Sequence, residues 1–309
     1  MKSKFKIGID YGGTKIEGIL LNQDGKQLER KRYSYERNYL SGIETVKKLV
    51  DEFDKISEEA SSVGIGIPGF SSRQTGIITN ANSLWLNDKP FKKDLELALN
   101  REVRLMNDAN CFTLSEAVDG AGKNYKSIFG IIIGTGFGGG LSYNKSIIEG
   151  SNQIAGDWGH QPLPYPTKDE QEIKISCPSN NCGRPLCAEQ FMSGIGFKDR
   201  FNQKYDTNFT SEEIVKLDLE NDPRANLELG LYEDRMARLM AVMIGIFDPD
   251  AIILGGGMSN IDRFYKNIPS LIPKYTFSNK VETKVLKNLH GDSSGVRGAA
   301  WLWNNEQYY

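Results

Sequence analysis

Two glycine-rich turns, each directly behind a short apolar strand, constrain this sequence more than any other feature. The first reads DYGGTK over residues 10–15 and follows the strand expected at 5–9. The second reads GTGFGGG over residues 134–140 and follows the strand expected at 128–133. Glycine lets a backbone approach a ligand closely, and successive backbone N–H groups in such turns form a concavity that binds anions. Two such turns predict two walls of one phosphate site, and therefore an enzyme that uses a nucleotide.

Hydrophobic periodicity places these turns in an α/β fold. In the first part of the chain the pattern predicts strands at 5–9, 16–21, 27–35, 63–67 and 103–106, and helices over 43–56, 94–100 and 109–118. The order strand, glycine turn, strand, turn, strand begins again at residue 128, which indicates a repeat of organisation without a repeat of sequence. A capping box at 210–213, a long helix within 223–247 and a buried strand at 251–254 follow. This alternation predicts a mixed sheet in each half.

Composition excludes several classes of partner. The 309 residues carry a net charge of −2, which gives no electrostatic reason to expect a nucleic acid or an anionic membrane. No apolar run approaches the roughly 20 residues of a membrane span. Residues 1–5 lead straight into a strand, without the apolar stretch of a signal peptide. We therefore expect a cytoplasmic protein that acts on a small molecule and binds neither nucleic acid nor membrane.

Two common nucleotide motifs do not account for the second turn. Residues 134–139 fit G-x-G-x-x-G, but that dinucleotide motif needs a helix directly behind it. The sequence continues instead as GLSYNK over residues 140–145, which is typical of a hairpin. The pattern G-x-x-x-x-G-K-[ST] is absent, so the sequence does not indicate a P-loop enzyme.

Asp10 lies at the end of a predicted buried strand, beside the first glycine turn. A carboxylate there can hold Mg²⁺ through water, near the outer phosphates of a nucleotide. The alternative is a turn aspartate that accepts hydrogen bonds from its own backbone. The neighbouring Gly12, Gly13, Thr14 and Lys15 favour the magnesium site.

These segments resemble the ROK family of sugar kinases. The resemblance covers residues 10–15 and 134–140 as the family's two phosphate elements. It continues through NDAN at 107–110, GDWGH at 156–160 and GGG at 255–257, in the same order. It implies an actin-like ATPase (ribonuclease H-like) fold, with two α/β domains around a cleft, and ATP-dependent phosphorylation of a hexose. The implied domains are residues 1–119 and 120–296, with a C-terminal helix at about 297–309 that packs back on the first.

The resemblance also implies an ATP site. Its residues are Asp10, Gly12, Gly13, Thr14, Lys15, Gly134, Thr135, Gly136, Gly138, Gly255, Gly256 and Gly257. Mg²⁺ is expected at Asp10, through water.

Transfer of a phosphoryl group to a sugar hydroxyl needs a base that takes the proton. Asp108 lies between a predicted strand and a predicted helix, so its carboxylate can face a cleft. Its position alone favours a second reading, a helix cap. The resemblance to the family's Asn-Asp pair implies that Asp108 is the general base and that Asn107 binds sugar hydroxyls. Gly69 and Asn82 are also expected to bind the substrate.

Further sugar contacts are implied at Asp157, His160 and Glu189. The family's motif is Gly-Glu-x-Gly-His, whereas this chain has the shorter Asp157 in place of the glutamate. An aspartate still accepts hydrogen bonds, but its reach differs.

Three of the four cysteines fall within residues 177–187, which in a reducing compartment indicates a metal site. The resemblance implies one structural Zn²⁺ held by His160, Cys177, Cys182 and Cys187, a set that suits tetrahedral coordination. The gap before Cys182 is four residues, where the family has one. The alternative is three reduced thiols without a metal. The fourth cysteine, Cys111, lies on an apolar helix face and is expected in the core.

The identity of the sugar depends on shorter stretches. Residues 80–87, 159–164 and 290–301 resemble the bacterial fructokinase and mannokinase branch, so we expect a 6-kinase of fructose, or of mannose or glucose. The alternative is an N-acetylglucosamine kinase of the same family, which needs room at C2 that Trp85 could fill. In a different class, a non-catalytic actin-like ATPase or a ROK-type regulator stays open. We also expect a homodimer.

Overall fold

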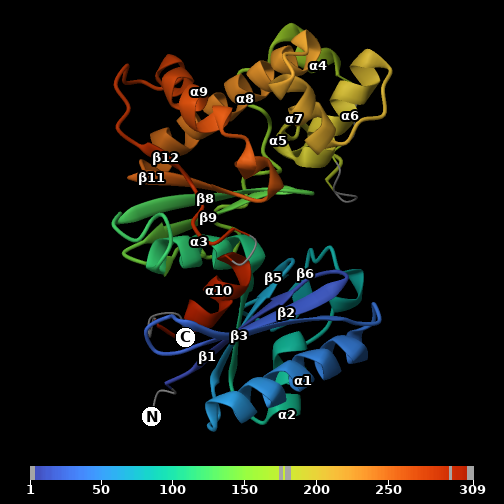
Figure 1. Cartoon of the computed structure of the whole chain (residues 1–309), viewed down its shortest axis with the longest axis vertical. Helices are drawn as coiled ribbons and strands as arrows, with labels where there is room; N and C mark the ends of the chain where they lie inside the picture. Colours follow the sequence, from blue (N-terminus) through green and yellow to red (C-terminus); the bar gives the residue numbers. More distant parts are fainter. Residues whose placement is uncertain (1–3, 174–176, 178–181, 292–293, 305–309) are drawn as a thin grey trace. The chain divides into compact units, whose positions relative to one another are not determined.

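A computed structural model describes residues 4–173, 177, 182–291 and 294–304. The chain forms two compact units (Figure 1). The first unit comprises residues 1–124, 140–155 and 289–309, and the second comprises 125–139 and 156–288. The boundary expected between residues 119 and 120 stays a prediction.

The first unit is built on a five-stranded sheet with the order β3-β2-β1-β4-β7. The strands are β1 (Lys6–Tyr11), β2 (Lys15–Leu21), β3 (Gln27–Ser34), β4 (Ser62–Ile67) and β7 (Val103–Asn107). β1, β2 and β3 form an antiparallel meander, while β4 and β7 run parallel to β1. The carboxyl ends of β1, β4 and β7 therefore meet at one edge of this sheet.

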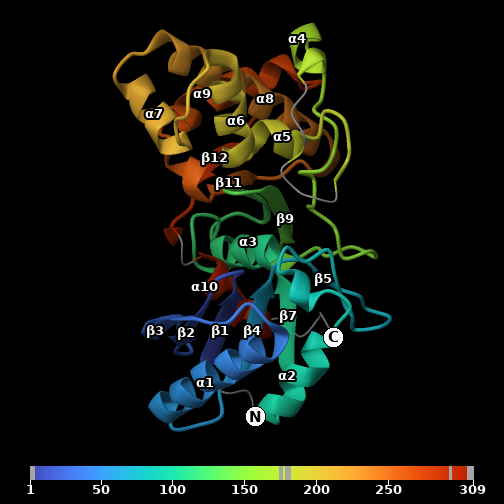
Figure 2. The ribbon, with the colours of Figure 1, turned by 90° about the vertical axis from the view of Figure 1, so that its right-hand side faces the viewer.

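Helices cover both faces of the first sheet. One face carries α1 (Tyr39–Ser57) and α2 (Phe91–Leu99), and the other carries α3 (Asp108–Val118) and α10 (Ser294–Trp301) (Figures 1 and 2). A buried apolar cluster fills each interface. The backbone of α10 lies almost against the sheet, because a Cβ at Gly64 would lie 1.9 Å from the carbonyl oxygen of Ala299. Only glycine permits that approach.

The second five-stranded sheet has the order β10-β9-β8-β11-β12. Its strands are β8 (Ser127–Ile133), β9 (Phe137–Tyr143), β10 (Ser146–Ile147), β11 (Ala251–Gly255) and β12 (Lys284–Lys287). β8, β11 and β12 are parallel, and β9 pairs with β10 in an antiparallel hairpin. If the strands of each sheet are numbered one to five along the chain, both sheets have the spatial order 3-2-1-4-5. This shared order confirms the predicted repeat of organisation.

Most of the helices belong to the second unit. They are α4 (Lys168–Glu172), α5 (Ala188–Met192), α6 (Gly194–Tyr205), α7 (Ser211–Leu219), α8 (Pro223–Phe247) and α9 (Arg263–Leu271). Short elements complete the described chain: β5 (Phe70–Ser71), β6 (Ile78–Thr79), η1 (Leu84–Leu86), η2 (Gly257–Asn260), η3 (Ile272–Lys274) and η5 (Leu302–Asn304). Within the described ranges, no helix has both the length and the apolar character needed to cross a membrane.

Several element boundaries differ from the sequence-based prediction. β9 begins at Phe137, so the second glycine turn is shorter than residues 134–140. The prediction missed this because glycine is a poor strand former. Here glycine fits the strand, since a Cβ at Gly139 would lie 2.8 Å from the Gly130 carbonyl oxygen. The helix expected at 94–100 begins at Phe91, and the C-terminal helix begins at Ser294. Residues 305–309 of that expected helix lie outside the described residues.

Candidate functional site

The carboxyl edge of the first sheet gathers the predicted residues of the first unit. Asp10 lies near the end of β1, Gly69 follows β4, and Asn107 ends β7. The strand register places Asp10 beside Gly66, and Asn107 beside Ile67. Ligands of α/β sheets bind outside the carboxyl ends of parallel strands, so this edge is a candidate site.

The first glycine turn connects β1 to β2 at this edge. Gly12 N donates to the carbonyl oxygen of Lys15 at 3.1 Å, and the Tyr35 hydroxyl donates to the carbonyl oxygen of Gly12 at 2.9 Å. Gly13, Thr14 and Lys15 are exposed. The backbone of the turn is therefore fixed by hydrogen bonds at Gly12, while residues 13–15 are accessible to a ligand. Asn82 is also exposed.

Asp10 and Asp108 form a region of negative potential. Burial, the largest cause, and the charges of Asp108 and Glu17 together raise the pKa of the Asp10 carboxyl to about 7, against the opposing charge of Arg32. Carboxylates that repel each other in this way are stabilised by a cation, and oxygen ligands are those that Mg²⁺ prefers. The arrangement thus suits the magnesium site predicted at Asp10.

The Asn-Asp pair begins α3. Asn107 is the N-cap residue, since its Oδ1 accepts a hydrogen bond from Ala109 N at 2.9 Å. Its Nδ2 donates to the carbonyl oxygen of Gly69 at 3.3 Å. Asp108 is the first residue of the helix, has an exposed side chain, and accepts a hydrogen bond from Ala109 N at 2.8 Å. The N-cap of α3 is therefore Asn107, and not Asp108, which the sequence alone had favoured as a helix cap.

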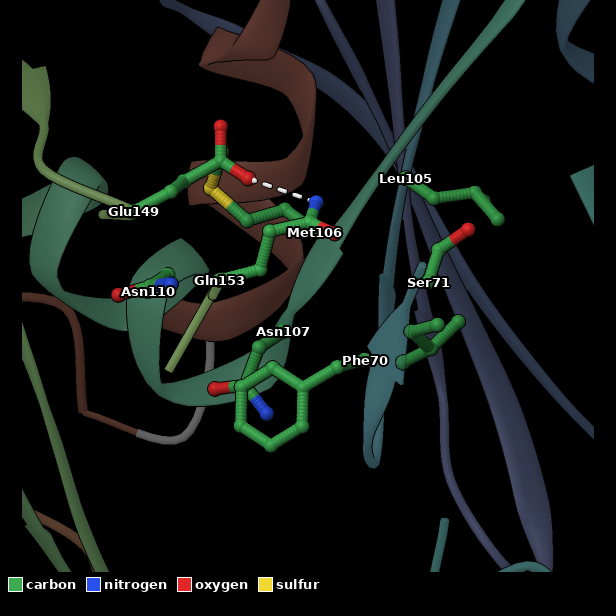
Figure 3. A pocket seen from close by; sticks show the side chains of 9 residues that line it. Phe70, Ser71, Leu105, Met106, Asn107, Asn110, Glu149 and Gln153 are labelled. Atoms are coloured by element: carbon green, nitrogen blue, oxygen red, sulfur yellow. Dashed lines mark hydrogen bonds between the residues drawn. The ribbon is translucent and has the colours of Figure 1, made fainter. Parts of the chain in front are cut away.

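A cavity of about 20 Å³ lies beside Asn107. Phe70 and Leu105 contribute apolar walls, and Glu149 and Gln153 contribute polar ones (Figure 3). Gln153 Nε2 donates to Glu149 Oε2 at 3.4 Å. Sequence analysis missed Glu149 and Gln153 because they belong to a loop far from Asn107 in the chain. No local pattern in the sequence signals that approach.

In the second unit the turn at residues 134–136 lies at the carboxyl end of β8. Gly134 N donates to the Gly136 carbonyl oxygen at 3.0 Å. The neighbouring parallel strand β11 ends at Gly255, and Gly256 follows with φ of +79°. A Cβ at Gly256 would lie 2.4 Å from the Ile133 carbonyl oxygen, so the two glycine segments are adjacent. Gly138 lies within β9, outside this turn.

The four predicted metal ligands converge in the second unit. Their ligand atoms lie within 4.8 Å of one another. Cys187 Sγ is 3.4 Å from both Cys177 Sγ and Cys182 Sγ, and it is 3.6 Å from His160 Nδ1. In a tetrahedral zinc site with Zn–S bonds of about 2.3 Å, sulfur atoms stand about 3.8 Å apart. The cluster therefore fits one such ion, Cys177 included. Residues 178–181 lie outside the described part of the chain.

Electrostatics favour the thiolate of Cys187 and the protonated ring of His160, and only the first of these is a form that binds zinc, since a histidine ligand must be neutral. The hydrogen bond with Cys187 raises the pKa of His160 to about 9, with further contributions from Glu189 and Asp157. Burial alone would raise the pKa of the Cys187 thiol, but hydrogen bonds with His160, Cys177 and Cys182 lower it overall. A thiolate is the form of cysteine that binds zinc.

The remaining predicted sugar residues lie beside the cluster. Burial raises the pKa of the Asp157 carboxyl, and the adjacent His160 opposes that shift. Glu189 is only 4% exposed, and its Oε2 accepts a hydrogen bond from Phe137 N at 3.0 Å. The structure thus brings Asp157, His160 and Glu189 together, and it connects Glu189 to the second glycine turn.

Comparison with known proteins gives consistent matches over most of the chain. A model of the ROK family matches residues 6–306. The chain is 36% identical over 296 residues to an N-acetyl-D-glucosamine kinase of Vibrio cholerae serotype O1, covering 96% of this chain and 98% of that protein. It is 35% identical over 303 residues to an N-acetyl-D-glucosamine kinase of Haemophilus influenzae, with the same coverage. The crystal structure of a ROK hexokinase from Thermus thermophilus has a TM-score of 0.83 at 23% identity, covering 96% of each chain. This likeness confirms the expected actin-like ATPase fold.

Proposed function

The chain belongs to the ROK family, and on that premise we propose that it is an ATP-dependent sugar kinase whose substrate is N-acetyl-D-glucosamine. The observation that carries the proposal is the similarity of 35–36% identity across 96% of the chain to two kinases of that sugar. The fructokinase expectation depended on three short stretches and is not supported by the full-length similarity.

The environment of Trp85 supports room for an N-acetyl group. Its Nε1 donates to the Tyr11 hydroxyl at 3.2 Å, and its ring contacts the Tyr35 ring edge-on at 6.2 Å. The indole thus packs on the core of the first unit, and Trp85 does not line the cavity beside Asn107. That cavity has room for about one water molecule or one methyl group. We propose that it receives the methyl end of the 2-acetamido group.

In this proposal Asp108 is the general base. As the oxygen of the sugar 6-hydroxyl bonds to the γ-phosphorus of ATP, the proton of that hydroxyl moves to the Asp108 carboxylate and ADP leaves. Asn107 and Gly69 orient the sugar, and Asp157 and His160 bind sugar hydroxyls. The glycine turns at 12–15 and 134–136 bind phosphates through backbone N–H groups. Asp10 would hold Mg²⁺ through water, and the ion would supply charge neutralisation at the phosphates.

Structural zinc is proposed at His160, Cys177, Cys182 and Cys187. The support is the convergence of four ligand atoms at distances that suit one tetrahedral ion. Zinc would fix the loop that carries His160 and leave Nε2 of that ring for the substrate, because the described contacts use Nδ1. The expected homodimer stays a prediction.

Measurement of ADP release tests the function. The panel is N-acetylglucosamine, N-acetylmannosamine, glucose, mannose and fructose, each with ATP and Mg²⁺. We expect the highest kcat/KM for N-acetylglucosamine. A higher kcat/KM for fructose than for N-acetylglucosamine would favour a fructokinase. If no sugar of the panel stimulates ADP release, the proposed sugar kinase activity is refuted.

A further inference from the structure

The second glycine turn is held at both ends by the segment that follows Cys187. At its start, the Gly134 carbonyl oxygen accepts a hydrogen bond from Gly194 N at 2.8 Å. At its end, Phe137 N donates to Glu189 Oε2 at 3.0 Å. Glu189 belongs to α5 and Gly194 begins α6, so one short stretch of chain fixes both ends of the turn.

The turn is also shaped to admit the carboxylate of Glu189. A Cβ at Gly136 would lie 3.0 Å from Glu189 Oε2, which is closer than nearly all such contacts in proteins. A side chain at that position would push the carboxylate away from Phe137 N. Glycine at 136 therefore serves the contact with Glu189 as well as the approach of a phosphate.

The same segment is hydrogen-bonded to the loop that carries His160. Ala188 N donates to the Gln161 carbonyl oxygen at 2.8 Å, and Glu189 N donates to the Gly159 carbonyl oxygen at 2.7 Å. The Cys187 thiol lies 3.3 Å from that same Gly159 oxygen. Cys187 and Glu189 are thus hydrogen-bonded to the loop that carries His160. Cys177 Sγ, 3.5 Å from Glu189 Oε1, adds a direct contact.

Electrostatics indicate what Glu189 contributes to the turn. A buried carboxylate near a phosphate site repels the ligand by charge alone. Its favourable contribution is therefore geometric: a charge-assisted hydrogen bond fixes the peptide between Gly136 and Phe137, and with it the direction of the preceding amides. Because the turn is already ordered in the free protein, nucleotide binding does not carry the entropic cost of ordering it.

We propose that Glu189 is a positioning residue of the nucleotide site: it fixes the second glycine turn from the segment that carries the metal cluster, so that metal occupancy sets nucleotide affinity. The role is additional to the sugar contact implied by the family resemblance. It rests on the proposed function, since it takes the turn at 134–136 to bind nucleotide phosphates.

The experiment measures the Kd of ADP with Mg²⁺ by calorimetry, without sugar. Wild type, Glu189→Ala and Glu189→Gln are each measured with one equivalent of Zn²⁺ and after its removal by a chelator. A charge-assisted hydrogen bond corresponds to about 10-fold or more in affinity. We expect a loss of about that size in Glu189→Ala and in metal-free wild type. In Glu189→Ala, removal of the metal should change the Kd of ADP little further, because the hydrogen bond from Phe137 N to Glu189 is already absent.

Glu189→Gln keeps an acceptor for Phe137 N and should bind ADP within about 3-fold of wild type. Glu228→Gln is the matched control, because it changes another buried glutamate of the second unit, one that accepts hydrogen bonds from Lys204 and Tyr205 and makes no described contact with the turn. It should leave the Kd unchanged. Circular dichroism checks folding. If Glu189→Ala does not fold, the comparison of ADP affinity in wild type with and without the metal tests the proposal by itself.

Two results overturn the proposal while leaving the kinase intact. One is ADP affinity in Glu189→Ala equal to that of wild type, which would restrict Glu189 to the sugar. The other is wild-type affinity that does not change when the metal is removed. A wild-type protein that binds no ADP at all would overturn the proposed function itself, and this role with it.

Discussion

Replacing Glu170 by glutamine removes an acid that joins two buried arginines of α8. The side chains of Glu170 and Arg235 are each 4% exposed, and that of Arg238 is 2% exposed. Arg235 Nε donates to Glu170 Oε1 at 2.7 Å, and Arg238 donates to both carboxylate oxygens, at 2.7 and 3.0 Å. Arg238 also donates to the Pro164 carbonyl oxygen at 2.9 Å. These hydrogen bonds therefore hold the segment around Pro164, which follows His160 in the chain, against α8.

The pKa of Glu170 gives the size of the effect. Burial alone would raise this pKa, but hydrogen bonds from Arg238, the Thr167 backbone and Arg235 lower it from 4.5 to about 2. A difference of that size corresponds to about 3 kcal/mol of stability. Removing one partner of a buried ion pair costs about 3–5 kcal/mol, which agrees. Because the folded pKa is depressed, the contribution is complete above pH 4.5 and is lost as the pH falls toward 2.

Urea unfolding at a series of pH values measures the effect. We expect Glu170→Gln to lower the free energy of unfolding by about 3 kcal/mol at pH 7 and by progressively less below pH 4.5. Glu212→Gln is the control, since Glu212 is exposed in the first turn of α7 and should change stability by less than about 0.5 kcal/mol. A loss under about 1 kcal/mol at pH 7, or one of equal size at pH 3.5, would refute the argument.

Three further outcomes test the site. Asp108→Asn should lower kcat by about 10²–10⁴-fold while the Kd of ADP stays unchanged, and a variant that retains most of its kcat would remove the base role. Ser71→Leu fills the cavity beside Asn107, so kcat/KM for N-acetylglucosamine should fall by about 10-fold or more, and that for glucose by much less; equal losses would place the acetamido group elsewhere. Elemental analysis should give about one zinc per chain, and near zero in Cys187→Ser, whereas full occupancy in that variant would contradict the ligand set.

The sequence by itself determined the elements whose signals are local. The capping box predicted at 210–213 is present, with both reciprocal hydrogen bonds between Thr210 and Glu213. The long helix within 223–247 is confirmed, with proline in its first turn and Asp248 left-handed at its end. Cys111 is fully buried, as expected. Such features follow from a few neighbouring residues, because caps, turns and periodicity act over one or two helical turns.

Tertiary structure alone decided which of these residues meet. The sequence placed Glu189 near the zinc motif, but only the fold brings its carboxylate to Phe137 N. The four-residue gap before Cys182 left Cys177 open as a ligand, and packing brings its sulfur to 3.4 Å from Cys187. The sequence left the surroundings of Trp85 open, and the fold brings its indole Nε1 to the Tyr11 hydroxyl at 3.2 Å. In each case the partners are far apart in the chain or separated by an irregular loop. Their approach is set by which surfaces the sheets and helices bury, and local propensity carries no information about that.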